Sequence, residues 1–155
     1  MPGPISAGLL LYRRSPYGLE VLLGHPGGPL YENRDEGAWS IPKGKAEGNE
    51  LLLEAAIREF EEETGFLVDG PFQELGAIVQ KSGKTVHAWA CEGSIDAKRA
   101  KSNLIRFEWP RKSGEFLVFP EIDRCEWFTI PIARTKINPA QAEFFERLEK
   151  QLSKN

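Results

Sequence analysis

No apolar run in this chain of 155 residues approaches the length of about 18 residues that a membrane-spanning helix needs. The N-terminal stretch also lacks a basic segment ahead of its apolar residues, so it predicts a first strand and not a signal peptide. No block of lysine or arginine is present and the net charge is −3, which argues against a general nucleic-acid-binding surface. We therefore expect a globular protein with neither a membrane nor nucleic acid as its partner.

Cysteine is also scarce. Cys91 and Cys125 are far apart and show no metal-type spacing, so we expect two buried, reduced thiols and no disulfide. Reduced thiols fit a cytoplasmic location. The chain length and the 41% of hydrophobic residues predict a single domain over residues 1–155 with a sizeable core.

The most informative stretch is a glycine-containing loop that leads into an expected helix at 51–65. At 100° per residue, Glu59, Glu62 and Glu63 share one face of this helix. A second stripe points in another direction and can pack against a sheet. This stripe consists of Leu53, Ile57, Phe60 and Thr64.

Three carboxylates on adjacent turns repel one another, more strongly where solvent is partly excluded. A hard divalent cation removes the repulsion and takes oxygen ligands, which indicates Mg²⁺ or Mn²⁺ on the face formed by Glu59, Glu62 and Glu63. Arg58 lies at i,i+4 from Glu62 and is placed to hold that carboxylate. The alternative is an acidic, solvated helix face, which such a run usually forms when considered alone.

The spacing decides between these interpretations. Residues 44–66 fit G-x5-E-x7-R-E-U-x-E-E-x-G-U, where U is a bulky aliphatic or aromatic residue. A chance match at the seven fixed positions has a frequency on the order of one in 10^8 per starting position. The stretch therefore resembles the box of the Nudix hydrolase family. The matching residues are Gly44, Glu50, Arg58, Glu59, Phe60, Glu62, Glu63, Gly65 and Phe66.

This resemblance implies an α/β (α+β) fold, a Nudix-type αβα sandwich with a mixed β-sheet between helices. It implies a metal-dependent pyrophosphohydrolase that cleaves a phosphoanhydride in a nucleoside diphosphate derivative. By resemblance, Glu59, Glu63 and the Gly44 carbonyl bind metal, and Glu62 is the proton acceptor for the attacking water. Within the family the role of base sometimes moves to the position of Glu59 or to a glutamate on a later loop.

A later glutamate that faces the helix could serve either as another metal ligand or as the base, and the sequence alone does not choose this residue. Glu115, Glu121 and Glu126 are the candidates, and we favour Glu121 as a catalytic residue beside Glu62 and Arg58.

Lys43 stands directly before Gly44 and is a candidate for phosphate binding, because a cation there neutralises phosphate oxygens during transfer. The alternative is an exposed lysine on a turn. The tripeptide Pro42-Lys43-Gly44 at this position resembles the one found in Nudix members that act on dinucleoside polyphosphates and on inositol pyrophosphates.

Three further residues are substrate-binding candidates. Tyr31 lies in a long loop at 25–37, and long loops in compact domains are often functional. Trp39 begins the stretch 39–43 that leads into the box. His87 shares a strand face with Trp89 and could line a cleft, although ordinary cross-strand packing is the favoured interpretation of this pair.

The rest of the chain predicts strands and two more helices. Strands at 6–12 and 19–24, joined by a turn at 13–18, form a hairpin. Further strands are expected at 72–81, 85–91, 104–109, 116–119 and 125–128, and a short helix at 132–137.

A last helix is expected at 139–152. Asn138 suits its N-cap, and Gln141 suits the third position of a capping box.

Three functions remain open. The first is hydrolysis of a dinucleoside polyphosphate or nucleoside triphosphate, and the second is hydrolysis of a nucleotide sugar. The third is a non-catalytic Nudix-fold module that binds or senses a nucleotide, which the intact glutamates argue against. The expected cofactor is Mg²⁺ or Mn²⁺ and the expected partner is a small nucleotide, and the sequence leaves a homodimer open.

Overall fold

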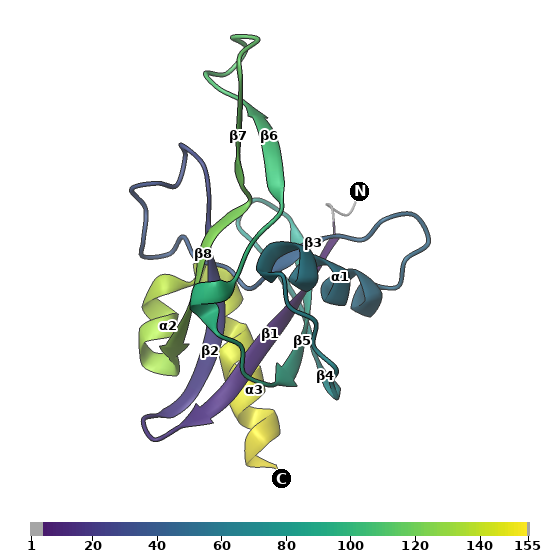
Figure 1. Ribbon diagram of the computed structural model, residues 1–155. Helices are drawn as coiled ribbons and strands as arrows, with labels where there is room; N and C mark the ends of the chain where they lie inside the picture. The colour runs from purple at the N-terminus through teal and green to yellow at the C-terminus, as the bar shows by residue number, and fades with distance from the viewer. Residues whose placement is uncertain (1–4, 155) are drawn as a thin grey trace.

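A computed structural model describes residues 5–154. Figure 1 shows a sheet between helices. The strands are β1 (Ile5–Ser15), β2 (Gly18–Pro26), β3 (Lys43–Lys45), β4 (Phe72–Val79), β5 (Thr85–Glu92), β6 (Leu104–Glu108), β7 (Phe116–Pro120) and β8 (Ile122–Thr129). The helices are α1 (Leu52–Thr64), α2 (Ile130–Lys136) and α3 (Glu143–Ser153), with short 3-10 turns η1 (Ala97–Arg99) and η2 (Pro139–Ala142).

The main sheet is mixed. Its strands follow the order β4-β5-β1-β2-β8, and β3 pairs with β1 beside this path. The β1–β5 pair is parallel, whereas β1–β2, β1–β3, β2–β8 and β4–β5 are antiparallel. Helix α1 covers one face and α2 and α3 cover the other, so the expected α+β sandwich with a mixed sheet between helices is confirmed.

The central strand β1 supplies both halves of the core. Leu9 and Leu11 point toward α1, and Leu10 and Tyr12 point toward α2 and α3. A strand that is buried on both faces needs a continuous apolar run, which explains the uninterrupted sequence of this segment.

The predicted hairpin of β1 and β2 is confirmed, but its turn is shorter than the predicted 13–18. Arg13 pairs with Glu20 across the two strands, with 2.8 Å between Nε and Oε1. This cross-strand ion pair continues the ladder to Ser15 and Gly18, and only two residues remain in the turn.

Helix α1 agrees with the predicted helix to within a residue at each end. At its start, the Glu54 side chain accepts a hydrogen bond from the Leu51 N–H at 3.0 Å. At its end, Gly65 adopts φ 81°, a left-handed conformation that favours glycine and stops the helix.

The C-terminal helix begins differently from the prediction. Asn138 is an N-cap, because its Oδ1 accepts from the Ala140 N–H at 3.1 Å. The capping box at Gln141 is wrong, because this side chain is fully buried and its Oε1 accepts from the Ile41 N–H at 3.0 Å. The cap therefore opens the turn η2, and α3 starts only at Glu143.

Strands β6 and β7 form a separate two-stranded ribbon that projects from the body (Figure 1). Within residues 5–154, no helix has the length and apolar character needed to cross a membrane. Cys91 and Cys125 are both buried and unbonded.

Candidate metal and phosphate site

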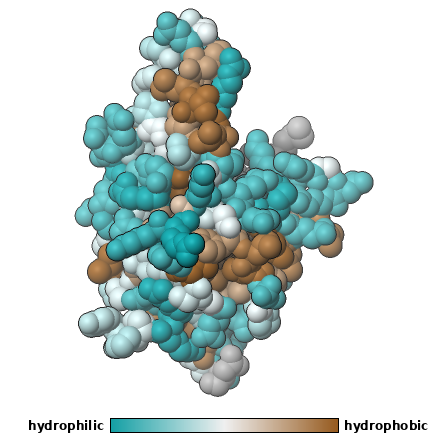
Figure 2. All heavy atoms as spheres, in the orientation of Figure 1, coloured by the Kyte–Doolittle hydropathy of each residue, from teal (hydrophilic) through white to brown (hydrophobic). Residues whose placement is uncertain are grey.

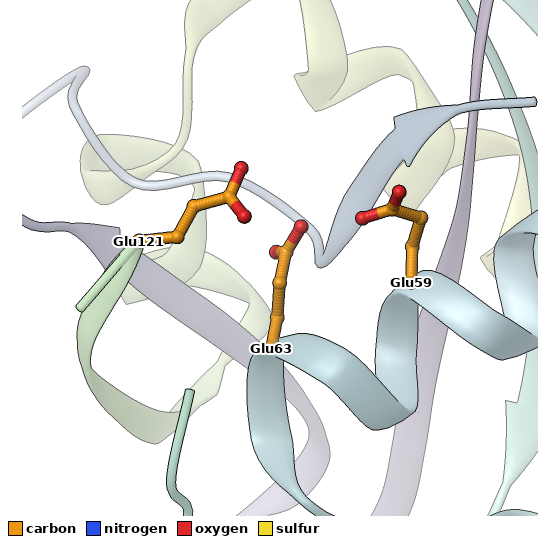
Figure 3. A group of neighbouring side chains, drawn as sticks. All are labelled: Glu59, Glu63 and Glu121. Carbon is orange, nitrogen blue, oxygen red and sulfur yellow. The ribbon is translucent and has the colours of Figure 1, made fainter. Parts of the chain in front are cut away.

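Three glutamates from two distant parts of the chain meet at one point. Glu59 and Glu63 lie one turn apart on α1, and Glu121 lies between β7 and β8. One carboxylate oxygen from each lies within 4.8 Å of the others. Figure 3 shows the three carboxylates pointing toward one another. The structure thus joins Glu121, favoured among the three later glutamates, to two of the predicted metal ligands.

Burial makes this cluster a poor place for unneutralised charge. Glu59 is 8% exposed and Glu63 only 2%. Burial, together with the charges of Glu121 and Glu59, holds the pKa of Glu63 well above its usual range. Burial also raises the pKa of Glu59. Such a group must either take up protons or bind a cation, and an all-oxygen donor set suits Mg²⁺ or Mn²⁺.

Gly44 in β3 leaves the space that the Glu59 carboxylate occupies. A Cβ at residue 44 would lie 2.1 Å from the Glu59 carboxyl carbon. The Gly44 main chain therefore lies beside the Glu59 carboxylate, and its role as a carbonyl ligand stays a prediction. The next residue back, Lys43, donates its backbone N–H to Glu63 Oε1 at 3.3 Å.

Glu121 is held in place by its neighbours. Its backbone N–H donates to the Asn103 carbonyl at 3.0 Å, and its Oε1 accepts from Asn103 Nδ2 at 3.2 Å. Its own carbonyl accepts from the Gly27 N–H at 2.9 Å. Three hydrogen bonds to two segments fix the carboxylate opposite α1.

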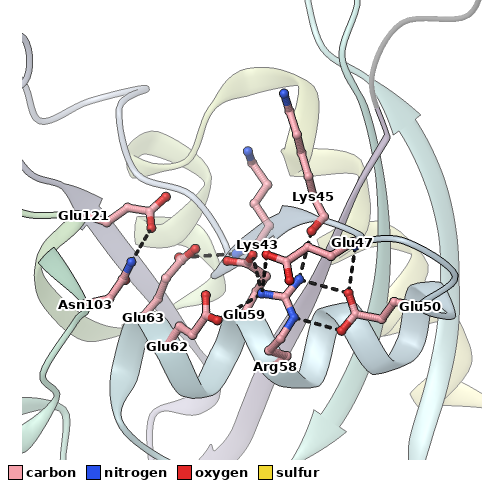
Figure 4. A network of polar contacts seen from close by, with 10 residues as sticks. All are labelled: Lys43, Lys45, Glu47, Glu50, Arg58, Glu59, Glu62, Glu63, Asn103 and Glu121. Carbon is pink, nitrogen blue, oxygen red and sulfur yellow. Dashed lines mark hydrogen bonds and ion pairs between the residues drawn. The ribbon is translucent and has the colours of Figure 1, made fainter. Parts of the chain in front are cut away.

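Arg58 organises the outer side of the site (Figure 4). Its guanidinium binds Glu50 through Nε at 2.8 Å and Nη2 at 3.0 Å. Nη1 lies 3.0 Å from both Glu59 and Glu62, so the predicted Arg58–Glu62 pair is confirmed. These bonds lower the pKa of Glu50 to about 2. Glu50 belongs to the box, but its spacing from Arg58 did not reveal that the two residues bind each other.

Glu62 differs from the other two glutamates of its predicted face. Its side chain is 42% exposed, it binds Arg58, and it is not a member of the three-carboxylate group. Residues four apart project in nearly the same direction, so Glu59 and Glu63 converge while Glu62 is turned toward Arg58. Glu62 nevertheless lines the cavity beside the cluster.

Two cavities lie on this side of the molecule, and carboxylates of the cluster line only one of them. One, of about 520 Å³, is lined by Glu59, Glu62 and Glu121 among others. The other, of about 450 Å³, lies beside the loop that follows β2. Lys43 and Lys84 line both cavities.

These two lysines form a cationic bridge between the cavities. Burial, followed by the charge of Lys84, lowers the pKa of Lys43. Within the described part of the chain neither lysine forms an ion pair. Two neighbouring cations without a carboxylate partner are suited to an anionic ligand. Lys84 was not predicted as a site residue, because only the pairing of strands brings it close to Lys43.

The other predicted substrate contacts have mixed outcomes. Tyr31 lines the smaller cavity, together with Arg34. The substrate role predicted for Trp39 is contradicted, because this residue is 1% exposed in the core and its Nε1–H donates to Asp35. His87 stacks on Trp89, pairs with Glu74 and lines neither cavity, which agrees with the favoured packing interpretation.

The NUDIX domain family matches residues 4–148. A curated relative, the asymmetrical bis(5'-nucleosyl)-tetraphosphatase of Rattus norvegicus, is 38% identical over 60 residues. That match covers 35% of this chain and 41% of the relative's own length.

Solved structures share the fold over nearly the whole chain. A C. elegans Ap4A hydrolase binary complex has a TM-score of 0.66 at 19% identity, covering 99% of this chain and 100% of that chain. A MutT protein from Methanosarcina mazei Go1 has a TM-score of 0.60 at 24% identity, covering 97% and 95%. The NUDIX domain of Shewanella oneidensis NrtR, complexed with ADP ribose, has a TM-score of 0.66 at 12% identity, covering 98% and 90%. At these identities the likeness concerns the fold alone.

Proposed function

The chain belongs to the NUDIX family, and on that premise we propose that it is a metal-dependent pyrophosphohydrolase, formed by a single domain over residues 1–155. The observation that carries the proposal is the group formed by the buried Glu59 and Glu63 and the partly buried Glu121. It lies beside Lys43 and Lys84, which form no ion pair with another described residue. Carboxylates that need a cation and lysines that suit an anion meet at the wall of one cavity. A polyphosphate with its divalent cation supplies both charges.

Glu59, Glu63, Glu121 and the Gly44 carbonyl would hold the cation, which we propose to be Mg²⁺ or Mn²⁺. When bound, it supplies positive charge that polarises a phosphoryl group. Lys43 and Lys84 neutralise the charge that spreads over the phosphoryl oxygens in the transition state. Since Lys43 is half-buried, its charge is less screened than that of a surface lysine.

We assign the proton acceptor role to Glu62. It lines the cavity but stands outside the buried group, so its carboxylate is free to take a proton from water. Arg58 orients it through the 3.0 Å bond from Nη1, while the bidentate contact with Glu50 fixes the guanidinium itself. Glu121, one of the catalytic residues predicted from the sequence, is better suited to the metal, because its carboxylate lies with those of Glu59 and Glu63.

For the substrate we favour a dinucleoside polyphosphate. The second cavity places Arg34 beyond the lysine pair, next to Tyr31, so positive charge continues away from the cluster. A long phosphate chain can follow these groups, whereas the two phosphates of a nucleotide sugar leave part of them unused. The local match to a tetraphosphatase points the same way. We place the protein in the cytoplasm, since both buried thiols are reduced.

A substrate panel with Mg²⁺ tests the proposal. We expect turnover of diadenosine tetraphosphate, with less or none of ADP-ribose and nucleotide sugars. Glu63→Gln should lose Mg²⁺ binding and turnover, whereas Glu61→Gln, an exposed residue of the same helix, should keep both. Tight nucleotide binding without any turnover would instead support the non-catalytic sensor.

A further inference from the structure

His25, near the end of β2, is buried although the proposed metal site does not use it. Its side chain is 0% exposed, whereas histidine is not among the residues that are most often fully buried. Its ring packs edge-to-face against Trp39, with 5.1 Å between the ring centroids. Because a buried polar group needs hydrogen-bond partners, the partners of its two nitrogens indicate what this residue does.

Both partners are hydrogen-bond acceptors. Nδ1 lies 2.9 Å from Oδ1 of Asp123 in β8, and Nε2 lies 2.6 Å from the backbone carbonyl oxygen of Arg34. A neutral imidazole has one N–H group, so one of its nitrogens would face an acceptor with a lone pair. The imidazolium ion donates to both acceptors, and the Asp123 carboxylate balances its positive charge. Arg124 approaches the same Asp123 oxygen only to 3.6 Å, so His25 is the closer cation.

The loop segment 28–34 has few other attachments. Figure 2 shows mainly hydrophilic surface where the loop after β2 lies, at the left of the view, and residues 32–36 are all exposed. Inside the segment, the Tyr31 N–H donates to the Gly28 carbonyl at 3.2 Å, and the Arg34 N–H donates to the Tyr31 carbonyl at 2.9 Å. Among the described residues, the bond from His25 to Arg34 is the only hydrogen bond that joins this segment to the rest of the protein.

Arg34 carries the end of this segment to the proposed substrate site. Its side chain lines the smaller cavity together with Lys43 and Lys84, and none of the three forms an ion pair with another described residue. A hydrogen bond to phosphate weakens steeply when donor and acceptor are misaligned. The position of the Arg34 backbone, which His25 holds, therefore decides whether the guanidinium meets a phosphate that lies beyond the lysines.

Residues 121–123 hold both ends of the loop. At its start, the Gly27 N–H donates to the Glu121 carbonyl at 2.9 Å. At its far end, Asp123 binds His25, and His25 binds Arg34. Because Glu121 is also one of the proposed metal ligands, one short segment sets the distance between the metal and Arg34.

We propose that His25 is a positioning residue, an imidazolium held by Asp123 that places Arg34 against the distal phosphates of the substrate and so favours a long polyphosphate. The inference rests on the proposed function and deepens it, since only a long phosphate chain reaches Arg34 from the metal. His25 itself lines neither cavity and acts through the Arg34 backbone. The two residues should therefore contribute one shared effect on substrate binding.

Two amide variants separate this role from the burial of the ring. Glutamine places its Nε2 near the position of the imidazole Nε2, and asparagine places its Nδ2 near that of Nδ1. His25→Gln thus keeps the bond to Arg34, whereas His25→Asn keeps only the bond to Asp123. Both variants bury an amide in place of the ring, so circular dichroism should show similar decreases in melting temperature.

The KM for diadenosine tetraphosphate should rise at least about tenfold in His25→Asn, the effect of losing one hydrogen bond to a charged group. It should stay near the wild-type value in His25→Gln. The kcat should change little in both variants, because the lost interaction concerns binding and not the reacting phosphate. Equal KM values for the two variants would show that His25 has only a structural role.

A double-mutant cycle tests whether His25 acts through Arg34. Arg34→Ala should raise the KM as much as His25→Asn does, and the two changes together should produce no further increase. Arg111→Ala is the matched control, since it removes an exposed arginine that lines neither cavity, and its KM should equal that of the wild type. Additive effects of the two changes would contradict the proposal.

Nitrogen NMR tests the clamp without any turnover. The chain has two histidines, so the imidazole spectrum of His87→Asn contains His25 alone. At neutral pH both ring nitrogens should show the chemical shift of a protonated nitrogen, and one bare nitrogen would overturn the imidazolium.

Calorimetry with inorganic tripolyphosphate separates this inference from the proposed hydrolysis. His25→Asn should weaken tripolyphosphate binding at least about tenfold, and His25→Gln should not. If the wild type hydrolyses no member of the substrate panel, the proposed function fails, whereas the ratio of these two affinities still tests the role of His25. Equal affinities of the two variants would overturn that role.

Discussion

The carboxyl group of Glu59 fills the space that a side chain at Gly44 would need, with only 2.1 Å between its carbon and the position of a Cβ. Glycine is needed here because a side chain would collide with Glu59, and not because of the backbone conformation, since Gly44 does not have a positive φ.

Gly44→Ala should therefore displace the Glu59 carboxylate from the buried group. We expect a loss of turnover on the order of 100-fold, the effect of misplacing a catalytic group by about 1 Å. Gly93→Ala is the control, because its Cβ would meet only the end of the Leu11 side chain at 3.2 Å. Mg²⁺ titration calorimetry should show weaker binding by the first variant, and unchanged binding would contradict the steric argument.

Glu62→Gln should reduce turnover about 10²- to 10⁴-fold, the usual effect of losing a general base. The melting temperature should hardly change, because Arg58 keeps its bonds to Glu50 and Glu59. Glu61→Gln provides the matched change at an exposed site. If Glu62→Gln keeps more than about a tenth of wild-type turnover, the base lies elsewhere, and Glu121 is the next candidate.

Metal-free stability should fall as pH rises above the ordinary glutamate value of 4.5. The pKa of Glu63 is raised in the folded state, so the protonated side chain adds to the free energy of unfolding. This contribution is complete below the ordinary glutamate pKa, and it is lost as pH rises through the folded-state pKa. Mg²⁺ should remove this loss, because it binds the ionised carboxylates. The difference between the melting temperatures measured with Mg²⁺ and with chelator should grow as pH increases. For Glu63→Gln this difference should grow less. Parallel curves at every pH would show that the cluster binds no cation.

The thiols should be inert in the folded protein. Burial, followed by the charges of Glu63 and Asp123, raises the pKa of Cys125 to about 12, and burial also raises that of Cys91. Iodoacetamide at pH 8 should label both only after unfolding, because the thiolate is the reactive form. Mass spectrometry of unreduced native protein should show no loss of two hydrogens, and such a loss would reveal a disulfide.

The parts of the site that were predictable from the sequence are local. Helical spacing aligned Glu59 with Glu63 and Arg58 with Glu62, because four residues make about one turn. From the sequence, Glu121 could be named only as one of three candidates, because contacts from a distant residue bring it to α1. Asn103 donates its N–H to the Glu62 carbonyl of α1 at 2.8 Å and its Nδ2–H to Glu121 at 3.2 Å. Trp39 was misassigned because nearness to the box in sequence says nothing about the direction of its side chain.

The partner of Gln141 could not be read from its surroundings either. A glutamine three residues after an asparagine is equally suited to a capping box and to a long-range contact. The choice depended on strands that lie far away in the sequence.

The buried amide of Gln141 also has a consequence for the order of folding. Its Oε1 accepts from the Ile41 N–H at 3.0 Å, and its Nε2 donates to Gln80 at 2.9 Å and to Ser40 at 3.0 Å. One side chain near the C-terminus thus ties together the segment leading into Lys43 and the end of β4, two walls of the smaller cavity. During synthesis on the ribosome, that cavity cannot reach its final shape until residue 141 has left the exit tunnel.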